Sequence, residues 1–89
     1  MVEIIPAINA RTWDEVNEKI RRVEHFTKWV HLDVADGTFT KNTLWHNPLD
    51  LVGFESVAKI EVHLMESDPE ERFEAWLLPA VRRIIVHEE

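Results

Sequence analysis

The sequence predicts a parallel α/β fold in which four strands alternate with three helices. Short apolar segments recur along the chain, helix-start signals lie between them, and each segment alternates apolar with polar side chains. A strand, a helix and a further strand in succession are typical of right-handed crossover units, which place their strands parallel in one sheet. At 89 residues, the chain is expected to form a single domain over its whole length, 1–89.

The first strand is predicted over residues 2–9, a short apolar run. Thr12 and Glu15 then have the spacing of a capping box, in which a hydroxyl and a carboxylate satisfy the free backbone donors of a helix start. From Trp13 to about His25, apolar residues recur at steps of three and four. This spacing predicts an amphipathic helix.

The second strand is predicted over residues 29–34, and Asp36-Gly37 after it is typical of a turn. A polar loop follows through residue 42. Residues 48–53 are expected to hold a short helix with Asn47 as its cap. The apolar residues of this helix are Leu49, Leu51 and Val52.

The third strand is predicted over residues 60–65. Asp68 then caps another helix, with Pro69 at a position where a missing N–H does no harm. The fourth strand is expected over residues 83–87. The buried side of the last helix is predicted to consist of Phe73, Trp76, Leu77 and Ala80.

The two faces of the predicted strands differ in polarity. The apolar face, expected to pack on helices, carries Val2, Ile4, Ile8, Val30, Leu32, Val34, Ile60, Val62, Leu64, Ile84 and Val86. The other face carries Glu3, Ile5, Ala7, Asn9, Trp29, His31, Asp33, Glu61, His63, Met65, Arg83, Ile85, His87 and Glu89. Such a polar face is typical of the inner wall of a barrel, where an ionic layer of Glu3, Glu61 and Arg83 is expected near one rim. Because the pattern stops within a unit, we expect half of a (βα)8 TIM barrel, completed by self-association.

Three potential metal ligands lie on two of these strands. Side chains two apart on a strand share a face, so His31 and Asp33 point the same way, and His63 points with Glu61 and Met65. Two imidazoles and a carboxylate from neighbouring strands suit a divalent metal with open coordination positions. The alternative is a set of polar residues that face solvent or a subunit interface and hold no ion.

Composition narrows the classes of function. A net charge of −7 argues against binding nucleic acid through its phosphates, which needs clustered Lys and Arg. The absence of cysteine removes disulfides and thiolate ligands from consideration. The sequence shows neither an 18-residue apolar run nor a signal peptide pattern, so we expect no membrane partner and a cytoplasmic location.

Five separated motifs give the chain a family resemblance. They are Ile5-Pro6-Ala7-Ile8, His31-Leu32-Asp33-Val34-Ala35-Asp36-Gly37, Gly37-x-Phe39-x-x-Asn42, Val62-His63-Leu64-Met65 and His87-x-Glu89. In order and spacing they resemble the N-terminal part of the ribulose-phosphate 3-epimerases, which are metal-dependent (βα)8-barrel enzymes of pentose phosphate metabolism.

The resemblance implies roles for four residues. His31, Asp33 and His63 match the positions that bind a divalent metal in this family (Zn2+, Fe2+ or Mn2+), and Asp33 matches the residue that shuttles a proton at the carbon next to the substrate carbonyl. His63 and Met65 match positions that contact the substrate, a sugar phosphate. Metal stabilisation of an enediolate oxygen and a carboxylate base beside it are chemically compatible.

The chain departs from the family pattern in three respects. Ala7 replaces a Ser that hydrogen-bonds substrate, and Ala35 replaces a Met. The second catalytic Asp and the phosphate-binding loops lie on later strands of a barrel that typically needs about 250 residues. Related decarboxylase and aldolase barrels carry Lys where this chain has Ala35, which argues against their chemistry.

Two functions therefore remain open. The chain is expected to be a truncated, epimerase-like half-barrel, natural or engineered, that forms a homodimer and has no turnover of its own. The alternative is epimerisation of a pentose 5-phosphate at a site completed by a second chain. In that dimer, His63 of the partner would approach the place of the missing Asp.

Overall fold

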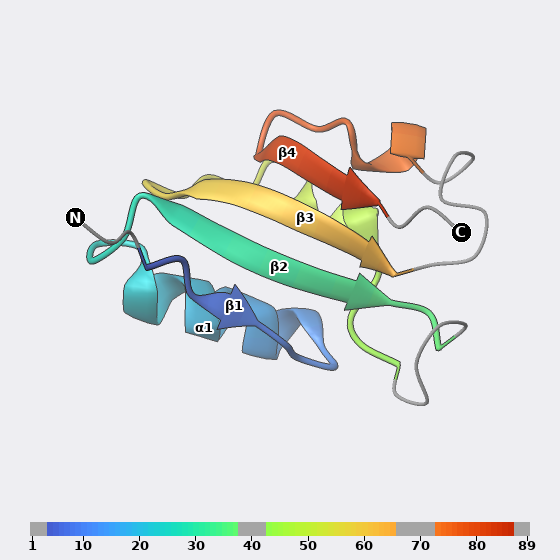
Figure 1. Ribbon diagram of the computed structural model, residues 1–89, viewed down its shortest axis with the longest axis horizontal. Coiled ribbons are helices and arrows are strands. Elements are labelled where there is room, and N and C mark those ends of the chain that lie inside the picture. Colours follow the sequence, from blue (N-terminus) through green and yellow to red (C-terminus); the bar gives the residue numbers. More distant parts are fainter. Residues whose placement is uncertain (1–3, 38–42, 66–72, 87–89) are drawn as a thin grey trace.

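The computed structural model describes residues 4–37, 43–65 and 73–86 and has four parallel strands in one sheet, in the order β1-β2-β3-β4 (Figure 1). The elements are β1 (Ala7–Ile8), α1 (Trp13–Val23), β2 (Trp29–Ala35), η1 (Pro48–Leu51), β3 (Lys59–Met65), η2 (Phe73–Trp76) and β4 (Val81–Val86). This confirms the predicted α/β class, the element order and the parallel pairing.

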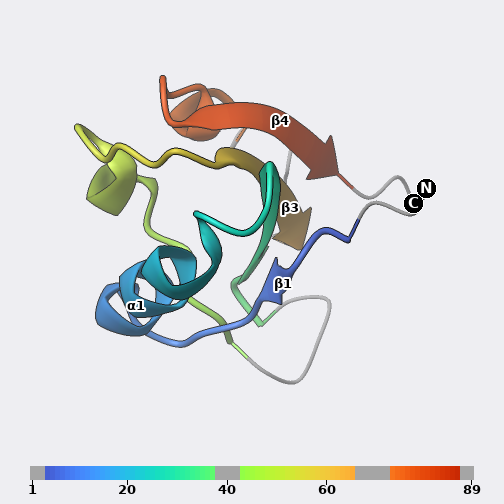
Figure 2. The same ribbon diagram turned by 90° about the vertical axis from the view of Figure 1, so that its left-hand side faces the viewer.

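The sheet is curved, and α1 and η1 lie on the same side of it (Figure 2). The strand faces turned toward this side are apolar, as the alternation predicts. Their residues Val30, Leu32, Val34, Ile60, Val62 and Leu64 are all buried. Consecutive parallel strands with helical segments between them on one side are the arrangement of part of a TIM barrel.

The first strand is much shorter than the predicted span of residues 2–9. Pairing begins only at Ala7, because Pro6 has no N–H to donate to the ladder, although its carbonyl accepts from the backbone N–H of His31 at 2.9 Å. Ile4, expected on the buried face, is 77% exposed. Val2 and Glu3 lie outside the described residues.

The second predicted helix is a single 3-10 turn, η1, capped by Asn47 as expected. A 3-10 turn repeats every three residues, so only Pro48 and Leu51 face the core. The expectation that Leu49 and Val52 also pack there is wrong, because they are 75% and 63% exposed.

The third predicted helix is likewise reduced to a 3-10 turn in its described part, η2. Trp76 is fully buried, whereas Phe73 and Leu77 are exposed and Ala80 is half-buried, so the broad predicted apolar side is wrong. One short turn can bury only one position per repeat. The predicted cap at Asp68 and Pro69 lies outside the described residues.

The final strand starts earlier than predicted, at Val81, and is described as far as Val86. Ile84 packs against the core, but Val86, expected on the buried face, is exposed. Because β4 is an edge strand of this sheet, it has a neighbouring strand on one side only. His87 lies outside the described residues.

The second strand ends in the expected turn. Gly37 has a φ of 88°, a conformation that L side chains rarely adopt, and Asp36 forms an isolated bridge with Thr43.

Among the residues that the structure describes, no helix combines the length and the apolar composition that crossing a membrane requires.

Candidate metal centre

The register of the sheet places the polar side chains in rows across neighbouring strands. His31 of β2 lies opposite Glu61 of β3, and Asp33 lies opposite His63 two residues later. Arg83 of β4 lies opposite Glu61, which extends the first row to three strands. Since the side chains of one row point to the same face, the parallel register brings these groups into direct contact.

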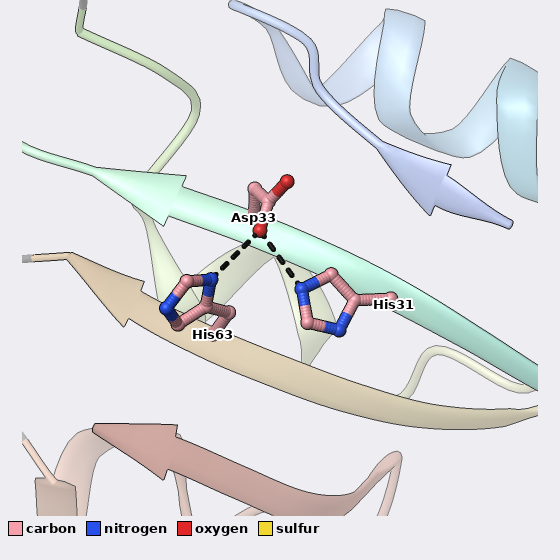
Figure 3. A group of neighbouring side chains, drawn as sticks. All are labelled: His31, Asp33 and His63. Atoms are coloured by element: carbon pink, nitrogen blue, oxygen red, sulfur yellow. Dashed lines mark hydrogen bonds and ion pairs between the residues drawn. The ribbon is translucent and has the colours of Figure 1, made fainter. Parts of the chain in front are cut away.

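The Asp33 carboxylate lies between two imidazole rings (Figure 3). Its Oδ1 atom is 3.0 Å from Nε2 of His31 and 3.0 Å from Nδ1 of His63. The two rings come from different strands, and their centroids are 5.4 Å apart. The three side chains therefore converge on one point near the carboxyl ends of β2 and β3.

This group fits a divalent metal ion. One ligand atom from each of His31, Asp33 and His63 can be chosen so that all lie within 4.8 Å of one another. Ligand atoms that share an ion at about 2.0–2.2 Å are separated by roughly 3–3.5 Å, which matches both N···O separations. Imidazole and carboxylate donors suit Zn2+, Fe2+ and Mn2+. Three protein ligands leave coordination positions for substrate or water.

The same side chains are only partly accessible. The side chain of Asp33 is 14% exposed, and those of the two histidines are slightly more so. Partial burial lowers the local dielectric constant and strengthens the attraction between the carboxylate and a cation. The remaining exposure lets an ion or a small substrate approach.

Glu61 lies on the same face of the sheet and contacts the ring nitrogen of His31 that does not contact Asp33. Its Oε1 atom is 2.7 Å from Nδ1 of His31, and its Oε2 atom accepts hydrogen bonds from Nε of Arg83 at 2.7 Å and from Nη2 of Arg83. Burial raises the pKa of Glu61, but the hydrogen bonds with His31 and Arg83 outweigh burial and hold the pKa below its ordinary value. The group is a carboxylate at neutral pH.

Arg83 is held in turn by an aromatic ring. Its guanidinium carbon lies 4.3 Å from the centroid of Trp29, the first residue of β2. The polar face is therefore a continuous series of contacts that runs from Trp29 to Asp33.

The structure brings together His31, Asp33 and His63, as the strand alternation predicts, and their role as ligands stays a prediction. Met65 lies on the same face, two residues beyond His63 and opposite Ala35. The predicted ionic layer is present for Glu61 and Arg83, and its third member, Glu3, lies outside the described residues.

Sequence reasoning missed the contact between Glu61 and His31. The alternation of side chains placed both residues on the inner face. Only the register of β2 against β3, which is not encoded in either strand alone, makes them direct neighbours.

Comparison with known proteins shows the family to which the chain belongs. The model of the "Ribulose-phosphate 3 epimerase family" matches residues 3–89. A ribulose-phosphate 3-epimerase of Synechocystis sp. is 30% identical over 91 aligned residues, which cover 99% of this chain and 39% of that protein. The chain thus spans well under half the length of this relative. No solved structure matched the chain. On the family match and the whole-chain similarity, the chain belongs to the ribulose-phosphate 3-epimerase family.

Proposed function

We propose that the chain is the metal-binding half of an epimerase site for a pentose 5-phosphate. His31, Asp33 and His63 hold Zn2+, Fe2+ or Mn2+ in this proposal, and His63 and Met65 also contact the substrate. The observation that carries it is the Asp33 carboxylate held between two imidazoles, in a chain that belongs to this family.

Asp33 is the proposed catalytic base. Its Oδ1 atom meets both imidazoles, whereas Oδ2 is directed away from the two rings (Figure 3). Oδ2 can therefore take the proton from the carbon next to the substrate carbonyl while Oδ1 stays with the ligand group. A bound ion supplies positive charge that stabilises negative charge developing on a substrate oxygen.

This half alone is not competent for epimerisation in our proposal. Inverting a carbon centre requires that a proton leave from one face and that another arrive on the opposite face. Within the described strands, Asp33 is the carboxylate of the ligand group, and it serves one face only. A second acid–base group must come from outside these four strands.

We propose that a second copy supplies the missing half. β1 and β4 are the two edges of the described sheet, and edge strands offer unpaired backbone groups to another strand. Two such sheets related by a two-fold axis provide the eight strands of a (βα)8 barrel and cover both polar faces. Metal-dependent turnover by such a dimer is the second candidate function. The cytoplasmic location expected from the sequence also stays a prediction.

Isotope exchange separates these functions. The purified chain is incubated with a divalent metal and ribulose 5-phosphate in D2O, and its mass is measured by light scattering. A chain whose site holds one base, whether monomer or dimer, is expected to exchange the C3 hydrogen for deuterium without forming the C3 epimer, because one base can remove and return a proton on one face. Dimers that form the epimer would establish the second candidate.

Variants test the role of Asp33. We expect Asp33→Asn to lower the exchange rate by about 100-fold or more, the usual contribution of a general base. Asp14→Asn, which removes an exposed carboxylate in the first turn of α1, is the matched control and should leave the exchange rate unchanged. A chain that binds no metal and exchanges no hydrogen contradicts the proposal.

A further inference from the structure

The carboxylate of Glu61 is clamped between two residues of neighbouring strands. One oxygen meets Nδ1 of His31 at 2.7 Å, and the other accepts both hydrogen bonds from Arg83. The Glu61 side chain is only 7% exposed. Both oxygens are engaged from opposite sides, and these contacts hold the carboxylate against the His31 ring.

This arrangement selects one tautomer of His31. A neutral imidazole carries one N–H, and an ionised carboxylate can only accept. Both ring nitrogens face a carboxylate, Nδ1 that of Glu61 at 2.7 Å and Nε2 that of Asp33 at 3.0 Å. An ion bound between His31 and Asp33 takes the lone pair of Nε2, so the ring hydrogen is then on Nδ1 and is donated to Glu61. Glu61 therefore favours the tautomer in which Nε2 is available to an ion.

Arg83 fixes the position of Glu61. A register shift in the pairing of β3 with β4 puts Arg83, rather than Arg82, opposite Glu61. The guanidinium packs over the ring of Trp29 at 4.3 Å, so the donor is itself held in place. The contacts thus run from Trp29 through Arg83 and Glu61 to His31.

We propose that Glu61 is a positioning residue of the metal centre, which, held by Arg83, orients His31 and presents Nε2 of that ring to a divalent cation. The proposal rests on the metal site proposed above. It adds that Glu61 orients the His31 ring in the absence of an ion. Carboxylates that hold metal-ligating histidines in this manner typically contribute about 10- to 100-fold to metal affinity.

Glu61→Gln tests the tautomer directly. Because Arg83 can only donate, the Gln oxygen turns toward it and the amide NH2 group faces His31. The ring must then accept at Nδ1 and carry its hydrogen on Nε2. We expect 15N NMR of the metal-free chain to show a hydrogen on Nδ1 for wild type and an unprotonated Nδ1, with Nε2–H only, for Glu61→Gln. Unchanged ring shifts would overturn the proposal.

Metal titration distinguishes positioning from simple loss of charge. Affinity for Zn2+ and Mn2+, measured by calorimetry, should fall about 10- to 100-fold in Glu61→Gln. Arg83→Met removes a positive charge, so electrostatics alone predicts tighter binding, whereas loss of positioning predicts weaker binding. We expect it to bind the metal several-fold more weakly than wild type, and tighter binding would overturn the proposal.

Glu24→Gln is the matched control. Glu24 is also 7% exposed and also paired with an arginine, Arg21, but it contacts none of the three ligands. It should change neither the ring shifts of His31 nor the metal affinity. If wild type binds neither ion, the metal site itself fails. If wild type binds and Glu61→Gln binds equally well, only the role of Glu61 fails.

Discussion

Glu24 is a buried carboxylate at the end of α1, away from the metal centre. Its Oε1 atom accepts hydrogen bonds from Oγ of Ser56 at 2.8 Å and from the backbone N–H of Val57 at 3.3 Å, and both oxygens lie within reach of Arg21. Burial raises the pKa of Glu24, but these hydrogen bonds outweigh burial and lower it below 4.5. The charged side chain therefore ties the helix to the segment before β3.

The lowered pKa of Glu24 predicts acid-sensitive stability. A carboxyl whose pKa is depressed on folding stabilises the protein at pH values above its unfolded pKa, and this contribution is lost as the pH falls below about 4.5 through the folded pKa. At pH 7, Glu24→Gln is expected to lower the free energy of unfolding by about 1–2 kcal/mol. The difference from wild type should shrink at pH 3.5.

Urea unfolding at the two pH values measures this effect. Glu74→Gln, at an exposed position of η2, is the control and should behave as wild type does at both values. Equal losses of stability in wild type and Glu24→Gln on acidification would contradict the prediction.

At the scale of elements, the start of α1 depends on Thr12. The Thr12 side chain accepts from the backbone N–H of Glu15 at 3.3 Å, as the capping box predicts. In a capping box, the carboxylate three residues after the cap accepts from the backbone N–H of the cap residue. Here the Glu15 carboxylate accepts from the Thr12 hydroxyl instead, at 3.4 Å. The structure thus confirms the hydroxyl half of the predicted capping box, whereas the carboxylate half has a different donor.

Removing the Thr12 hydroxyl is expected to cost about 1 kcal/mol of unfolding free energy, because one helix donor then loses its partner. Thr12→Ala should show this loss in chemical denaturation. Thr12→Ser keeps the hydroxyl and should stay within a few tenths of a kcal/mol of wild type. Similar losses in the two variants would argue against capping.

An aromatic cluster joins the helical segments. Trp45 is buried, and its ring centroid lies 5.4 Å from that of Trp13 in α1 and 5.6 Å from that of Trp76 in η2. Its Nε1 atom donates to Asp50 at 2.8 Å. Because η1 and η2 are single turns, these large rings supply packing that short helices do not.

Trp45→Ala is expected to lower the free energy of unfolding by about 3–5 kcal/mol, through lost burial and the cavity left behind. Trp45→Phe should cost less, since an aromatic ring remains. Leu49→Ala, at an exposed position of η1, is the control and should stay within about 0.5 kcal/mol of wild type. Thermal and urea unfolding both measure these differences, and a small loss in Trp45→Ala would refute the prediction.

At the scale of the whole molecule, metal binding should couple to folding. The ligands come from β2 and β3, so an ion that binds only the folded sheet stabilises it. At 100 times the dissociation constant, the gain is about 2.7 kcal/mol. For a domain of this size, such a gain corresponds to a rise in Tm of roughly 10 °C or more.

Differential scanning fluorimetry with Mn2+ or Zn2+ measures this shift, and added chelator should reverse it. Asp33→Asn removes the charged ligand and should show little or no shift at the same metal concentration. An equal rise in Tm for wild type and Asp33→Asn would place the bound metal elsewhere.

The sequence determined which face each strand residue occupies, because side chains alternate along any extended strand. Alternation alone therefore predicts that His31, Asp33, Glu61 and His63 share one face. The helix starts at Thr12 and Asn47 are also predictable from the sequence, because capping depends on hydrogen bonds between residues close together in the chain.

Tertiary structure alone decided which residues touch. The contact of Glu61 with His31 and Arg83 depends on the register of three strands that are far apart in the chain. Likewise, residues 48–53 and 73–80 have helical apolar spacing, but in the described structure they form only short 3-10 turns packed against the curved sheet. Alternation is a property of one strand, whereas register and helix length are settled by the packing of all the elements together.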